Sequence, residues 1–173
     1  MKTDVYELSG TEIDDENILG YLHEALQRTN AFDEVNSTTG AEYACLRSMM
    51  LEPQNPTMWN ALALVYMMSD RAKEAEEAIE RSLDINTSNE WTWTIWGNLL
   101  RQKGRLVEAE RAYRMAAELN STDANALKHL ALLLSSRGAY PEAVDLYQRL
   151  IPLKPNNQEL WDSYSVCLRK VAD

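Results

Sequence analysis

The chain has 173 residues, of which 45% are hydrophobic and 25% are charged, enough for one domain or for a short repeat array with a continuous core. It contains six glycines and five prolines, a composition that favours helix. The formal net charge is −10. Such a charge disfavours binding to nucleic acids and to anionic membrane surfaces, because both attractions need clustered Lys and Arg.

The start of the chain is the most acidic part. Residues 1–35 hold two basic and nine acidic residues, and we expect residues 1–13 to form a flexible acidic arm. The same stretch has no apolar core of the kind found in a secretory signal. No apolar run approaches the roughly 18 residues that span a bilayer. Cys45 and Cys167 lack companions at metal-ligand spacing, so we expect two buried thiols in a cytoplasmic protein, and no metal.

Residues 14–55 predict a degenerate helix pair. Its first helix would be ENILGYLHEALQRT (residues 16–29), and its second would cover residues 40–52. The first of these segments has apolar residues on one helical face, namely Ile18, Leu22, Ala25 and Leu26. Between the two segments, NAFDEVNSTTG reads as a lengthened loop.

From residue 56 onward the sequence repeats with a period of 34 residues, which is the signature of a repeat architecture. One series of equivalent positions is Trp59, Trp93, Leu127 and Trp161, and a second is Ala63, Gly97, Ala131 and Ser165. The period divides the chain into full units at 56–89, 90–123 and 124–157 and a half unit at 158–173. Residues 14–173 therefore predict one array of about nine helices.

Each full unit predicts two packed helices. Its first helix has apolar residues at the i, i+3, i+4, i+7 spacing of one helical face. Its second helix has a small, large, small pattern, as in Ala109, Tyr113 and Ala116. We expect Gly97 to allow the two helices to approach closely, with a large ring filling the space between units. We also expect Trp59, Trp93, Trp96 and Trp161 to pack in the core.

The helix boundaries follow from local signals. Gly104, Gly138 and Asp70 occupy the same place in successive units, where a left-handed residue ends the first helix. Asn55 before Pro56, and Asp123 before the third full unit, predict N-caps. Pro152 lies in the expected last turn of a second helix, so that helix should end early or bend there.

This pattern resembles the tetratricopeptide repeat. The family signature is Trp-x2-Leu-Gly-x2-Tyr, then Ala-x3-Phe-x2-Ala, then Pro. The unit at 90–123 matches it at five positions, which are Trp93, Gly97, Ala109, Tyr113 and Ala116. The resemblance implies an all-α, right-handed superhelical solenoid. It also implies a non-enzymatic protein–protein interaction module that binds a peptide or helix of another protein in a concave groove lined by the first helices.

On the repeat's geometry, positions 2, 5, 9 and 12 of each unit face this groove, together with His129. The candidate groove residues are Asn60, Leu64, Met67, Trp91, Thr94, Asn98, Arg101, Asn125, Lys128, His129 and Leu132. They suggest a partner with an apolar anchor and an acidic stretch over Arg101 and Lys128. The half unit adds Glu159 and Asp162 to the same face.

No catalytic motif or cofactor site is present in the sequence, so we expect no enzyme activity and no cofactor. Known family members that clamp a terminal carboxylate use a cationic set that this sequence does not supply. Two alternatives remain open. One is a self-associating scaffold, in which the uncovered C-terminal helix with Tyr164, Cys167, Leu168 and Val171 forms a homo-oligomer. The other is an assembly chaperone or a regulatory subunit of an enzyme complex.

Overall fold

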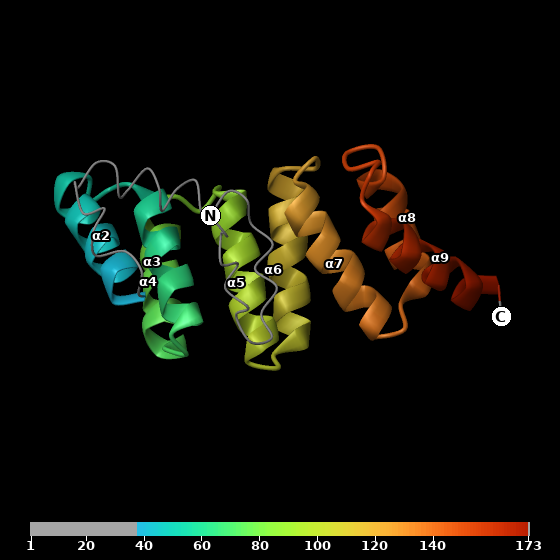
Figure 1. The fold of residues 1–173 in the computed structure, drawn as a ribbon, viewed down its shortest axis with the longest axis horizontal. Coiled ribbons are helices and arrows are strands. Elements are labelled where there is room, and N and C mark those ends of the chain that lie inside the picture. The colour runs from blue at the N-terminus through green and yellow to red at the C-terminus, as the bar shows by residue number, and fades with distance from the viewer. Residues whose placement is uncertain (1–37, 173) are drawn as a thin grey trace, which may run out of the picture.

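The computed structural model describes residues 38–172. The predicted acidic arm at 1–13 and the predicted helix at 16–29 lie outside this range. Within it the fold is all-α, and no strand occurs. The helices are α2 (Thr38–Leu51), α3 (Pro56–Met68), α4 (Ala72–Ile85), α5 (Glu90–Gln102), α6 (Leu106–Leu119), α7 (Ala124–Ser136), α8 (Tyr140–Leu150) and α9 (Gln158–Ala172). They follow one another along the long axis of the molecule as a row of hairpins (Figure 1), which confirms the predicted solenoid.

A left-handed residue ends the first helix of each hairpin, as predicted. Asp70, Gly104 and Gly138 have φ values of 55°, 74° and 80°. The amide of the residue after each of these donates to the carbonyl five residues before that amide. In the first hairpin the Arg71 amide donates to the Tyr66 carbonyl at 2.8 Å, and the equivalent bond occurs in the next two hairpins. This pattern satisfies carbonyls that a helix end leaves without partners.

The N-caps of the first helices also follow the 34-residue period. Asn55 Oδ1 accepts from the Thr57 amide at 3.0 Å, and Asp123 Oδ1 accepts from the Asn125 amide at 2.9 Å, so both predicted caps are confirmed. Asn89 and Asn157 hold the equivalent positions, and their Oδ1 atoms accept from the amides of Trp91 in α5 and Leu160 in α9. Each cap satisfies a backbone donor and fixes where its helix begins.

Three tryptophans at equivalent positions anchor the loops before their helices. The indole Nε1 of Trp59, Trp93 and Trp161 donates to the carbonyl six residues earlier, at 3.3, 2.8 and 2.9 Å. Trp59 and Trp93 are half-buried, whereas Trp161 is 42% exposed. The prediction of a core position is therefore wrong for Trp161, because no later helix within residues 38–172 covers α9.

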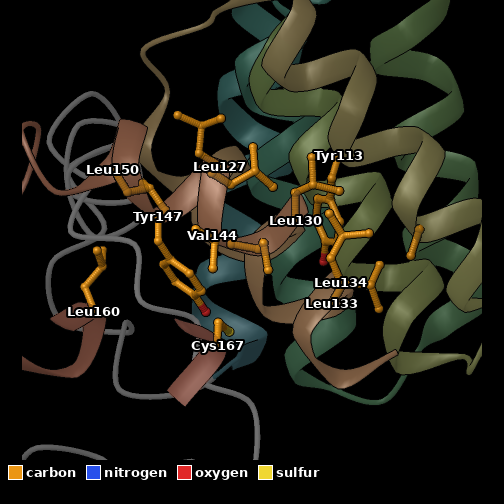
Figure 2. Packing of buried hydrophobic residues seen from close by; sticks show 14 of the residues in the cluster. Tyr113, Leu127, Leu130, Leu133, Leu134, Val144, Tyr147, Leu150, Leu160 and Cys167 are labelled. Atoms are coloured by element: carbon orange, nitrogen blue, oxygen red, sulfur yellow. The ribbon is translucent and has the colours of Figure 1, made fainter. Parts of the chain in front are cut away.

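The helices of each hairpin interlock through the predicted small and large residues. Ala109 and Ala116 are fully buried on α6, on either side of the buried Tyr113 ring, which packs against Gly97 of α5. Tyr147 of α8 is the equivalent of Tyr113, and its ring extends toward Cys167 of α9 (Figure 2). The chain departs from α-helix after Leu150, before Pro152, so α8 has 11 residues where α4 and α6 have 14. That early end confirms the effect predicted for proline.

Ion pairs join neighbouring hairpins at another edge of the array. Glu42, Glu76 and Glu110 are 34 residues apart, and each lies against a basic residue of the following hairpin. Arg71 contacts Glu42 at 2.8 Å, and Lys103 contacts Glu76 at 2.5 Å. Glu110 pairs with both Arg114 and Arg137. Except for Glu110–Arg114, which lies within α6, these pairs link successive hairpins of the solenoid.

Candidate functional site

Seven of the predicted groove residues have side chains that solvent reaches. Arg101 and Leu132 are exposed, and the other five are half-buried. All seven belong to α5 and α7, which contact each other directly. We call them the α5–α7 surface, and they are Trp91, Asn98, Arg101, Asn125, Lys128, His129 and Leu132.

The other four residues predicted to face the groove are buried, so they do not belong to the accessible part of this face. They are Asn60, Leu64, Met67 and Thr94. Leu64 and Met67 belong to an apolar cluster that includes side chains of α5. Asn60 Nδ2 donates to Thr92 Oγ1 at 2.9 Å, and Thr94 Oγ1 donates to the Glu90 carbonyl at 3.1 Å. The sequence did not reveal that these side chains are buried, because their burial depends on how closely helix α3 packs against helix α5.

Tyr113 of α6 is buried beneath the middle of the α5–α7 surface and contacts two of its residues. Its hydroxyl donates to Asn98 Oδ1 at 2.7 Å, and its ring stacks on that of His129, with centroids 5.6 Å apart. Burial raises the pKa of Tyr113 to about 12, and the nearby Arg101 guanidinium acts in the opposite direction. The hydroxyl therefore remains a neutral donor at physiological pH and holds the Asn98 amide in one orientation.

A hollow lies between α7, α8 and α9 at the side of this surface. Its lining residues are Lys128, Leu132, Tyr147, Asn157, Glu159, Leu160 and Ser163. Leu132, Leu160 and the Tyr147 ring make it partly apolar. The Lys128 ammonium lies 3.9 Å from a Glu159 carboxylate oxygen. The hollow thus combines apolar side chains with a charge pair.

Family models for the tetratricopeptide repeat match residues 56–89 and 96–158. The chain belongs to the tetratricopeptide repeat family. A comparison with curated proteins found no match.

Solved structures with the same repeat share the fold at low sequence identity. PilF of Pseudomonas aeruginosa superposes with a TM-score of 0.72 at 19% identity, over 90% of this chain and 69% of PilF. MamA superposes with a TM-score of 0.66 at 22% sequence identity, over 78% of this chain and 79% of MamA. The first repeat domain of Spaghetti (RPAP3) was solved with the HSP90 peptide SRMEEVD. It superposes with a TM-score of 0.64 at 19% sequence identity, over 69% of this chain and 98% of that domain.

Four residues of the hollow were not predicted as site residues. Tyr147 and Asn157 had a sequence signal, since they are the repeat equivalents of Tyr113 and of the predicted caps. Ser163 also had one, because it is the repeat equivalent of the predicted groove residue His129, whereas Leu160 had none. Which inner positions of a tetratricopeptide unit stay open depends on the spacing of neighbouring helices, and a one-dimensional pattern does not contain that spacing.

The described residues contain no group of three His, Cys, Asp or Glu side chains arranged to hold a metal ion. Over residues 38–172, no helix is long and apolar enough to cross a membrane.

Proposed function

We propose that this tetratricopeptide repeat protein is a non-enzymatic binding module that holds a segment of a partner protein across the α5–α7 surface. The segment, extended or helical, places one apolar side chain against Leu132 at the rim of the hollow. Its acidic residues lie near Arg101 and Lys128.

The hollow is the observation that carries this proposal. It is shallow and opens between α7, α8 and α9, and Leu132 at its rim is 36% exposed while Leu160 is 4% exposed, so an apolar side chain of the partner would pack against Leu132. Binding sites for protein segments commonly join such an anchor pocket to a few fixed polar groups. Asn98, held by the Tyr113 hydroxyl at 2.7 Å, is a fixed polar group of this kind.

The charge preference follows from the two basic side chains of the surface. Arg101 is exposed near the end of α5. The Lys128 side chain is only 13% exposed, while its neighbour Glu159 is 57% exposed. A partner carboxylate beside Lys128 would replace the solvated Glu159 contact with a less solvated one, which strengthens the attraction.

Two of the similar structures support a peptide ligand. The Spaghetti (RPAP3) domain is solved with an HSP90 peptide. YrrB, similar with a TM-score of 0.62 at 18% identity, is described as having an unusual peptide-binding site. We propose the same class of ligand for this chain.

A displayed library of random peptides, selected against the full chain, tests the proposal. Selected peptides should combine a large apolar residue with Asp or Glu. In fluorescence anisotropy, Arg101→Glu with Lys128→Glu should weaken their binding at least tenfold, or about 1.4 kcal/mol. Leu132→Asp should weaken it to a similar extent.

The matched control is Lys73→Glu with Arg111→Glu, which makes the same charge change on exposed positions of the second helices α4 and α6. This control should bind as the wild type does. Equal losses in both double variants would indicate a general charge effect and would overturn the proposed site.

A further inference from the structure

Helix α9 presents a stripe of exposed side chains. Trp161 and Leu168 are 42% and 41% exposed, and Ser165 between them is also exposed. Their spacing of four and three residues places them on one side of the helix. Val171, 49% exposed, adjoins the stripe. We call Trp161, Ser165 and Leu168 the α9 stripe.

The equivalent positions are half-buried or buried in α3 and α5, and in α7 they are fully covered. In α7 they are Leu127, Ala131 and Leu134, which are at most 3% exposed. There the covering element is the second helix of the same unit, α8, which packs along α7. The α9 stripe is therefore the face on which a first helix of this repeat receives its partner helix, and within residues 38–172 no helix occupies it.

The charges beside the stripe favour a particular occupant. Asp162 lies one turn inside the start of α9, and Arg169 lies in its last turn. They are seven residues apart, so they flank the stripe on the same side. If two α9 helices pair antiparallel, Asp162 of each copy comes opposite Arg169 of the other. In a parallel pair this flank of each helix would instead face the other flank of its partner, and Asp162 would have no Arg169 opposite it.

We propose that the α9 stripe pairs with the α9 stripe of a second copy of this chain, antiparallel about a twofold axis near Ser165. The second copy's helix takes the place of a second helix of the repeat. Trp161 and Leu168 are buried between the copies, and two symmetric Asp162–Arg169 pairs border them. Self-complementary contacts of this kind are the ordinary form of a twofold interface. The pairing does not depend on the proposed peptide binding, and it gives the dimer two α5–α7 surfaces.

Sedimentation velocity of the full chain over a hundredfold concentration range tests the dimer. Because two single helices bury less than a standard interface of about 1,600 Å², we expect a dissociation constant in the micromolar range. Leu168→Glu should leave only monomer at every concentration. The matched control is Val107→Glu, at a position on α6 that is 53% exposed, and it should dimerise as the wild type does.

Charge exchange tests the antiparallel register. Asp162→Arg alone and Arg169→Asp alone should each weaken dimerisation at least tenfold, because each sets like charges opposite one another. Mixing the two variants should restore a dimer that contains one copy of each. Both substitutions are at exposed positions, so helicity measured by circular dichroism should be unchanged.

A wild-type chain that stays monomeric over the whole range would overturn the proposal. So would a dimer that Leu168→Glu leaves intact. A dimer lost in Leu168→Glu, but without recovery in the mixture, would overturn the antiparallel arrangement.

Discussion

A Cβ atom placed on Gly97 would lie 2.4 Å from Cε1 of Tyr113, well inside van der Waals contact. Tyr113 is fully buried between α5, α6 and α7, and its hydroxyl is held by Asn98. The ring therefore has no free space into which it could move, and the absent side chain at Gly97 sets the distance between α5 and α6.

Gly97→Ala should lower the free energy of unfolding by about 1 to 3 kcal/mol, because overpacking outweighs the gain of about 1 kcal/mol in helix propensity. Urea denaturation followed by circular dichroism measures this. In combination with Tyr113→Leu, which removes the ring, the added alanine should cost much less. Purely additive effects would argue against the contact.

Thr92 of α5 joins helices α3 and α4 through a buried polar network. Its Oγ1 accepts from Asn60 Nδ2 at 2.9 Å and lies 3.0 Å from Ser82 Oγ. Thr92→Val keeps the shape but leaves the amide without its acceptor, so we expect a loss of about 1 to 3 kcal/mol in unfolding free energy. The exposed Thr87→Val is the control and should change little. Adding Asn60→Leu to Thr92→Val should recover part of the loss, as thermal unfolding would show.

Glu110 holds two arginines from successive hairpins and is only 12% exposed in its side chain. Glu110→Gln should lower stability by about 1 kcal/mol, because the arginines themselves are partly solvated. The difference from wild type should shrink as salt is added. Glu118→Gln, at an exposed position on the same helix, should show neither effect in thermal melts at low and high salt.

Burial, with a smaller contribution from Glu42, raises the pKa of Cys45 from the usual 9.0 to about 12. The folded chain therefore keeps the thiol protonated. The raised pKa of Cys45 contributes to folding stability in full below pH 9, and this contribution is lost as the pH rises from about 9 to about 12. In a Cys167→Ser variant at pH 8, the shifted pKa alone should slow alkylation about a thousandfold relative to the denatured chain. A native rate close to the denatured rate would show that Cys45 is accessible.

The sequence by itself predicted the repeat, its helical hairpins and most of the residues that begin or end its helices. Asn55, Asp70 and Gly104 act through their own backbone and its immediate neighbours, so their roles can be recognised without coordinates. The small residue at Gly97 and the large ring at Tyr113 were each predicted from the repeat pattern, whereas their direct contact became visible only in the structure.

The tertiary structure decided which of the predicted groove residues remain accessible. Asn60 and Asn98 both occupy positions predicted to face the groove, yet Asn60 is buried beside Thr92, while Asn98 is half-buried above Tyr113. The outcome depends on the distance and angle between first helices of successive units. Those quantities arise from the packing of all side chains at once, whereas periodicity specifies only the face on which each residue lies.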